Sequence, residues 1–138
     1  HAEEIKKKVG SAIEIHEHVD FPMKGRDVVT GLPKEAIISG EHIREAIDRS
    51  VKTIVDYVKM TLEVTPPELT ADIHERGLLL VGGGALLKGL DKVIAQAAEI
   101  PVRVADDPLT AVVRGAGILL EDDELLKEVV LPSARDDK

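Results

Sequence analysis

The sequence contains 138 residues, of which 43% are apolar, and its formal net charge is −8. This acidic balance disfavours a nucleic acid as the partner, and the absence of cysteine excludes disulfides, thiolate metal sites and cysteine nucleophiles while suiting a reducing compartment. No apolar run approaches the length of a membrane span and no secretory signal opens the chain, so we expect a cytoplasmic protein.

Residues 1–10 have the pattern of a helix end that stops at Gly10, a residue suited to a left-handed cap. The chain begins with His1 rather than Met, and the helix is already under way there. We therefore expect a piece of a longer protein.

Residues 11–40 have the pattern of a small β-meander, because short apolar stretches alternate with Pro- and Gly-containing turns. The expected elements are a half-buried strand at 12–21, a turn at 22–25, and two further strands at 26–30 and 34–38.

Residues 41–65 are expected to form one long helix that connects the meander to the rest of the chain. Apolar residues recur there every three or four positions, Ser39 is the expected N-cap, and Glu41 suits the first turn. The residues expected in the core are Ile47, Val51, Ile54 and Val58.

Residues 66–120 alternate helix and strand patterns, which is typical of an α/β unit with a parallel sheet. The expected elements are a short helix ending at Gly77, a strand at 78–81, a helix at 85–98, a strand at 102–105 and a helix to about 120.

Asp106 and Asp107 could be paired carboxylates for acid–base chemistry, but Asp107 before Pro108 is better explained as a helix cap. Residues 121–138 should form a short helix around 125–130 and a disordered charged tail.

The histidines do not point to a metal site. His16 and His18 would share one face of a strand, but no cysteine or well-spaced third ligand accompanies them, so a solvated strand surface is the preferred interpretation. His42 and His74 are isolated on helices, and the sequence gives them no role.

The run from Gly77 to Gly89 joins an apolar strand to a helix through three consecutive glycines. Such a backbone lets a ligand approach closely, and a following helix offers free N–H groups and a positive dipole end. Two common phosphate motifs do not fit: G-x-G-x-x-G fails at Leu87, and the Walker A pattern fails because Lys88 precedes Gly89. The glycines alone would fit a tight βαβ turn about equally well.

The same run resembles the adenosine motif of the actin-like ATPases, and most of all the MreB-type bacterial actins, in which Gly-Gly-Gly-Ala-Leu-Leu follows an apolar strand. The resemblance continues on both sides and covers nearly the whole chain. The matching blocks are Pro66-Pro67-Glu68-Leu69, Asp72-Ile73, Glu75-Arg76-Gly77, Ile100-Pro101-Val102, Ala105-Asp106-Asp107-Pro108-Leu109-Thr110 and Arg114-Gly115.

The fold that this resemblance implies is α/β, the second large domain of an actin-like ATPase of ribonuclease H-like architecture. It would contain a parallel βαβα unit with an inserted small antiparallel β plus α subdomain. The strand at 78–81 would pair on one side with 102–105 and on the other with a strand that precedes His1. In this chain that second edge would be open, so we expect the chain to self-associate through it, to exchange a segment between copies, or to cover it with its own displaced terminal helix.

The resemblance also implies a nucleotide site. Gly82, Gly83 and Gly84 would let adenosine and phosphates approach, and Ala85 and Leu86 would open the helix beside them. Glu3-Glu4-Ile5-Lys6 matches the segment in which a Glu and a Lys one turn apart contact the sugar or base, although Glu4 stands where an Arg is more usual. From spacing alone, Glu3 and Lys6 would fit an exposed helix of mixed charge.

The implied function is that of a rod-shape-maintaining bacterial actin that binds ATP with Mg²⁺, polymerises head to tail, and works with membrane-associated cell-shape proteins at the inner face of the membrane. This part would supply the adenosine side of the site, and it should be inactive and bind ATP weakly alone, since the catalytic and metal-binding groups would lie in the missing half. The alternatives are an ATPase domain of the sugar-kinase or chaperone type and an interaction module with a vestigial glycine turn.

Overall fold

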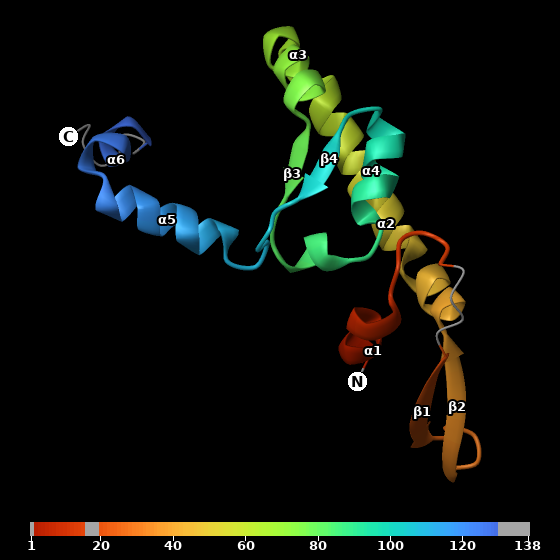
Figure 1. Cartoon of the computed structure of the whole chain (residues 1–138). Helices are drawn as coiled ribbons and strands as arrows, with labels where there is room; N and C mark the ends of the chain where they lie inside the picture. Colours follow the sequence, from red (N-terminus) through yellow and green to blue (C-terminus); the bar gives the residue numbers. More distant parts are fainter. Residues whose placement is uncertain (1, 16–19, 130–138) are drawn as a thin grey trace, which may run out of the picture.

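The computed structural model describes residues 2–15 and 20–129, and its elements are arranged along one long helix, α2 (Gly40–Glu63). A β-hairpin lies at one end of this helix, and a two-stranded parallel sheet with its helices lies beside the other half (Figure 1). His16, His18 and the charged tail from residue 130 lie outside the described residues. Among the described residues, no helix is both long and apolar enough to cross a bilayer.

Helix α1 (Ala2–Val9) buries Ile5 and Val9 and ends at Gly10. The N–H of Gly10 donates to the carbonyl of Lys6, but Gly10 does not have a positive φ, so the expected left-handed cap is wrong. The strand expected from residue 12 is also wrong over 12–15, where the chain forms no strand.

The inserted β subdomain is a hairpin of two antiparallel strands in the described part of the chain, rather than the expected three-stranded meander. Strand β1 (Asp20–Arg26) pairs with β2 (Pro33–Ser39), from Asp20 opposite Ser39 to Arg26 opposite Pro33. The turn expected at 22–25 lies inside β1, where Pro22 is tolerated because the strand is at an edge. Most of the strand expected at 26–30 is instead the hairpin turn.

The start of α2 confirms Ser39 as the N-cap. The Ser39 hydroxyl accepts from the N–H of His42 at 3.3 Å, and Nδ1 of His42 accepts from the N–H of Ser39 at 3.3 Å. This reciprocal pair is a capping box, which usually has Glu or Gln in the place of the histidine. His42 therefore has a structural role that the sequence pattern does not indicate.

The core lies between α2 and helix α4 (Leu90–Ala98). Val51 and Val55 of α2 form a buried cluster with Leu90 and Ile94, against which Ile47 and Val58 are partly buried. Ile54 was expected in this core but is 42% exposed, because it lies about 100° around the helix from Val55.

The α/β unit matches the expected parallel arrangement. Helix α3 (Pro67–Arg76) stops before Gly77 as predicted, and β3 (Leu78–Leu80) pairs in parallel with β4 (Val102–Val104). No described strand pairs with the second edge of β3. The helix expected from Ala85 begins five residues later, because a short 3-10 helix, η1 (Gly83–Leu86), and a left-handed Gly89 come first.

The last two helices are α5 (Ala111–Glu121) and α6 (Asp123–Val129). Asp107 was expected to cap α5, but the N-cap position is Thr110. The Asp107 carboxylate instead accepts from the Thr110 hydroxyl at 2.5 Å, and this bond is the main reason that the pKa of Asp107 lies below its ordinary value. The aspartate therefore stabilises the turn before α5.

Gly77 is a position where the fold requires glycine. Its φ is +79°, and an added Cβ would lie 2.9 Å from Cβ of Pro101. Gly77→Ala should therefore lower the free energy of unfolding by at least about 1–3 kcal/mol, measured by urea denaturation. Gly117→Ala in α5 is the matched control, because a Cβ there meets no atom within 4 Å and alanine favours a helix. Equal losses for the two variants would contradict this account of Gly77.

Candidate functional site

The glycine turn after β3 is fixed to the loop that follows β4. Gly82 has φ +80°, and its N–H donates to the carbonyl of Pro108 at 2.6 Å. The N–H of Ala85 donates back to the carbonyl of Gly82 at 3.2 Å, which closes the first turn of η1. The left-handed conformation at Gly82 directs the backbone away from β3, and glycine adopts it without steric cost.

The face of this turn is open. A Cβ on Gly82 or Gly84 would meet no atom within 4 Å, and one on Gly83 would meet only Leu109, at 3.6 Å. The N–H groups of Gly83 and Gly84 have no hydrogen-bond partner in the described part of the chain. The turn therefore offers free donors and space for an acceptor-rich ligand.

Ala85 and Leu86 were expected to open an α-helix beside the glycines, but they do not. Both belong to η1, Ala85 is buried and Leu86 is exposed. Because α4 starts only at Leu90, the expected helix dipole does not face the glycine turn. The donors at this place come from the turn itself.

Glu3 and Lys6 both lie on exposed positions of α1. An oxygen of Glu3 lies 3.2 Å from the ammonium of Lys7, four residues on, rather than pairing with Lys6. The hydrogen bond from Lys7, followed by the charges of Lys7 and Lys6, holds the pKa of Glu3 below its ordinary value. Glu3 is thus an acceptor-only carboxylate, and so exposed an ion pair adds little to stability.

Ser11 links α1 to the segment that follows the glycine turn. Its hydroxyl donates to the carbonyl of Lys88 at 3.2 Å, and the N–H of Ala12 donates to the same carbonyl at 2.8 Å. Ile13 also packs so closely on Gly89 that an added Cβ there would lie 2.5 Å from it. The structure therefore joins the two predicted parts of the site through Ser11 and Lys88, and no sequence pattern indicates this contact.

A cavity of about 370 Å³ lies between α1 and the hairpin, lined by Glu4, Ile5, Phe21, Pro22, Met23, Lys24 and Glu35. The Lys8 ammonium lies 5.4 Å from the centre of the Phe21 ring, a cation–π contact that holds the hairpin against α1. A second cavity, of about 120 Å³, lies where α1, β1 and α2 meet. None of the seven predicted site residues lines either cavity.

Residues 2–15 and 20–129 contain no group of three or more His, Asp or Glu side chains placed to hold a metal ion. Asp106 and Asp107 do not form a paired acid–base site either, since the Asp107 carboxylate is bonded to Thr110.

Comparison with known proteins assigns this arrangement to one family. A family model described as MreB/Mbl protein matches residues 1–128. The chain is 43% identical over 121 residues to the cell shape-determining protein Mbl of Bacillus subtilis, and 44% identical over 120 residues to the cell shape-determining protein MreB of Escherichia coli. These alignments cover 88% and 87% of the chain.

Solved structures agree with the sequence comparison. The crystal structure of MreB5 of Spiroplasma citri bound to ADP superposes with a TM-score of 0.84 at 38% identity, covering 93% of this chain and 39% of that one. The structure of the same protein bound to AMPPNP gives a TM-score of 0.82. The chain spans just over a third of the length of the curated relatives, 36% of Mbl and 35% of MreB.

Proposed function

The chain belongs to the MreB/Mbl family, and from this premise we propose that it supplies the adenosine side of an ATP site in a filament-forming protein that determines cell shape. Membership confirms the resemblance and the actin-like α/β fold predicted from the sequence. It also disfavours an ATPase domain of the sugar-kinase or chaperone type.

The observation that carries the nucleotide proposal is the open backbone at Gly82–Gly84. The unpaired N–H groups of Gly83 and Gly84 can donate to the oxygens of a nucleotide, and no side chain blocks the approach. Solved relatives with the same fold are bound to ADP and to AMPPNP, which supports a nucleotide as the ligand.

In this proposal Glu3 and Lys6 contact the sugar and base. The ionised Glu3 can accept hydrogen bonds from the ribose hydroxyls, and the Lys6 ammonium can donate to a ring or sugar acceptor. Ala85 supports the turn from inside, while Leu86 is free to contact the ligand. Mg²⁺ would accompany ATP and neutralise phosphate charge, and the residues of this chain would orient the adenosine.

The full-length protein of this proposal would hydrolyse ATP, form filaments, and act with cell-shape proteins at the cytoplasmic face of the membrane. If it associates without binding nucleotide, the interaction module with a vestigial glycine turn is the better description. It stays a prediction that copies of this chain, without the rest of the protein, pair through the open edge of β3.

Lys6→Ala tests the adenosine contact in the full-length protein. We expect the affinity for ATP to fall about tenfold, since a hydrogen bond from a charged group is lost, and titration calorimetry measures it. Lys92→Ala, on the exposed side of α4, removes the same charge away from the site and should leave the affinity unchanged. Equal affinities for the two variants would remove Lys6 from the site.

A further inference from the structure

Ser11 is the only buried polar side chain among residues 2–15 and 20–129, with 3% of its surface exposed. It lies two residues after the end of α1 and forms an isolated parallel bridge with Lys88. A hydroxyl taken out of water costs free energy unless protein groups replace its lost hydrogen bonds. The surroundings of Ser11 replace them, and they do so with groups from two distant parts of the chain.

The Ser11 hydroxyl is a centre of hydrogen bonds. It accepts from the N–H of Ile13 at 3.2 Å, and its proton is shared between the carbonyls of Ile13 at 2.8 Å and Lys88 at 3.2 Å. The N–H of Ala12 donates to the same Lys88 carbonyl at 2.8 Å. Beside these bonds, Ile13 packs on the left-handed Gly89, where an added Cβ would overlap it. Residues 11–13 together with Lys88 and Gly89 are called the clasp below.

The clasp connects the glycine turn to α1 through a continuous path of hydrogen bonds. The N–H of Leu87, one residue before Lys88, donates to the carbonyl of Gly84 at 3.1 Å. The N–H of Gly10, one residue before Ser11, donates to the carbonyl of Lys6 at 2.8 Å. The two ends of this path, in the glycine turn and in α1, belong to the two elements that are proposed to contact the nucleotide.

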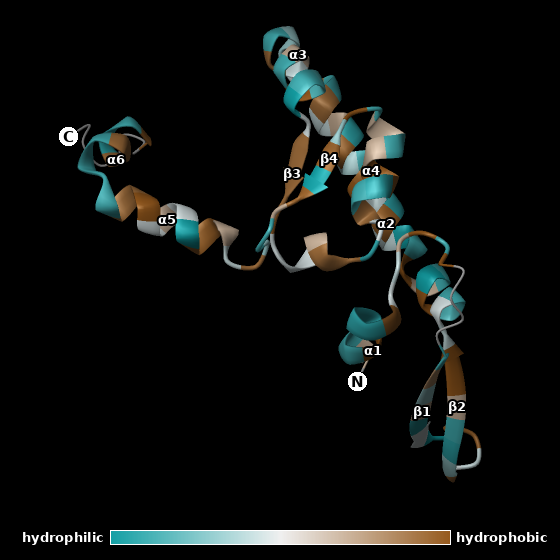
Figure 2. Ribbon diagram, in the orientation of Figure 1, coloured by the Kyte–Doolittle hydropathy of each residue, from teal (hydrophilic) through white to brown (hydrophobic). Residues whose placement is uncertain are grey.

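Helix α1 is too short to fix its own position. Of its eight residues only Ile5 and Val9 are buried, and Figure 2 shows that the helix is mainly hydrophilic. An isolated helix of this length is not stable in water, so tertiary contacts determine where it lies. Its contacts with α2 and β1, and that of Lys8 with Phe21, hold α1 toward the hairpin. The clasp holds it toward the glycine turn.

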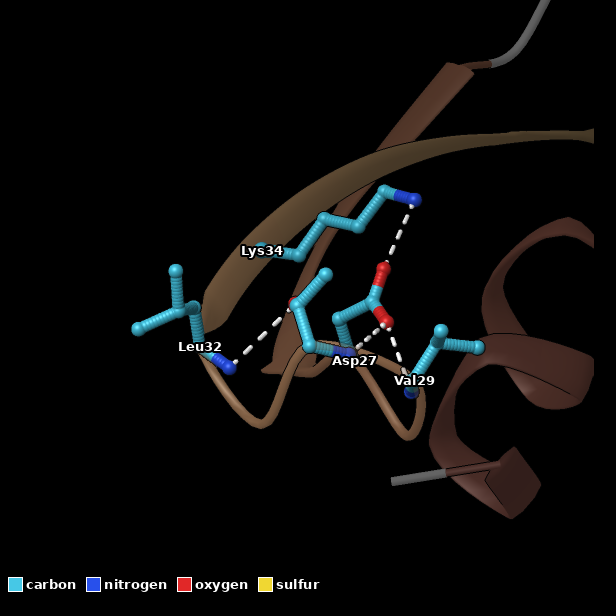
Figure 3. A network of polar contacts seen from close by, with 5 residues as sticks. Asp27, Val29, Leu32 and Lys34 are labelled. Atoms are coloured by element: carbon cyan, nitrogen blue, oxygen red, sulfur yellow. Dashed lines mark hydrogen bonds and ion pairs between the residues drawn. The ribbon is translucent and has the colours of Figure 1, made fainter.

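The hairpin turn has a similar centre of hydrogen bonds, but those bonds are local. The Asp27 carboxylate accepts from the N–H groups of Val29 and Thr30 at 2.8 and 3.1 Å and from the Lys34 ammonium at 3.1 Å (Figure 3). These bonds are exposed and reach no farther than seven residues along the chain, so they stabilise only their own turn. The bond from Ser11 to the Lys88 carbonyl joins residues 77 apart, and so it determines how two elements lie relative to each other.

We propose that Ser11 is a positioning residue for the nucleotide. It holds α1 at the separation from the glycine turn at which Glu3 and Lys6 reach a ligand bound at the turn. A ligand that contacts two elements binds tightly only when their separation is already correct, because an adjustment on binding costs affinity. The inference rests on the proposed nucleotide site and adds to it a residue that does not touch the ligand.

Replacing Ser11 with alanine should loosen the clasp without removing it. The N–H of Ile13 would lose its acceptor, while the Lys88 carbonyl would keep its bond from the N–H of Ala12. We therefore expect Ser11→Ala to fold, with α1 less firmly held against the segment that follows the glycine turn.

Hydrogen exchange of the Ala12 amide tests the clasp without any ligand. In the full-length protein, Ser11→Ala should make this amide exchange at least about tenfold faster, although its own partner, the Lys88 carbonyl, is unchanged. Ser50→Ala removes a hydroxyl from an exposed position of α2 and should leave the exchange rate as in the wild type. Equal rates for Ser11→Ala and the wild type, measured by NMR, would overturn the proposal.

A double-mutant cycle with Lys6 separates positioning from a general loss of structure. By titration calorimetry, Ser11→Ala should weaken ATP binding by the full-length protein about tenfold, and Ser50→Ala should not weaken it. In a Lys6→Ala background the same change at Ser11 should cost no more than about threefold, since only the contact of Glu3 is left to be misplaced. A tenfold loss in both backgrounds would mean that Ser11 acts through the fold in general, and would overturn the proposal.

Gly89→Ala disturbs the clasp from its other side. The added methyl group would push against Ile13, and φ of +77° is unfavourable for alanine, so ATP binding should again weaken about tenfold. Gly25→Ala is the matched control, because an added Cβ there meets no atom within 4 Å. Equal ATP affinities for these two variants would contradict the role of the clasp. A wild type that binds no ATP would refute the proposed function itself, whereas ATP binding that Lys6→Ala weakens and Ser11→Ala does not would refute only the role of Ser11.

Discussion

Gly84→Val should abolish measurable ATP binding by the full-length protein, with a loss of affinity of at least about 100-fold. The isopropyl group would fill the space in front of the turn, where the proposed ligand meets the backbone. The fold itself should tolerate the change, because a Cβ on Gly84 meets no atom within 4 Å and Gly84 does not have a positive φ. Titration calorimetry measures the binding, and urea denaturation measures the free energy of unfolding.

Gly25→Val is the matched control. It makes the same substitution at a glycine of β1 whose added Cβ also meets no atom within 4 Å, in a strand that favours valine. It should bind ATP normally. If Gly84→Val also bound ATP normally, the glycines would be features of a tight turn and the nucleotide proposal would lose its main support.

Ile94→Ala should destabilise this chain by about 2–5 kcal/mol in urea denaturation. Ile94 is the most buried large side chain of the described residues, only 1% exposed, and it packs against Val51, Val55 and Leu90. Alanine would leave a cavity in the cluster that joins α2 to α4, and the surrounding side chains can fill it only in part.

Ile54→Ala makes the same substitution on the exposed side of the core helix. Because Ile54 is partly in contact with solvent, its loss should cost under about 1 kcal/mol. If Ile54→Ala and Ile94→Ala lowered the free energy of unfolding by similar amounts, α2 would have to be rotated about its own axis relative to this structure.

The long amphipathic segments could be predicted from the sequence because their periodicity is strong. The bounds of α2 and α3 follow from Ser39, the Pro66-Pro67 pair and Gly77, each of which has a local reason to start or stop a helix. The hairpin could not be predicted at the right residues, since the side chain of Asp27 and the left-handed Gly31 place the turn where the apolar pattern suggests a strand. The 3-10 helix after Gly82 was missed because Leu86 continues the apolar pattern of α4 through a break at Gly89.

The location of the candidate site could be predicted in part. Three glycines after an apolar strand mark the open turn, and the structure shows that a side chain there would meet free space. The contact that joins this turn to α1 could not be predicted, because Ser11 and Lys88 lie 77 residues apart and neither belongs to a recognisable pattern. Two residues so distant in sequence come together only through the packing of the whole chain.

The length of α2 gives it a mechanical property. At 24 residues it is about 36 Å long, with its middle fixed in the core and the hairpin attached directly to its first residue. A tilt of about 10° about that fixed middle displaces each end of the helix by about 3 Å. The hairpin extends the N-terminal arm of α2 beyond Gly40 (Figure 1), so its outer turn moves farther than the end of the helix, and α2 can act as a lever between the sheet and the hairpin.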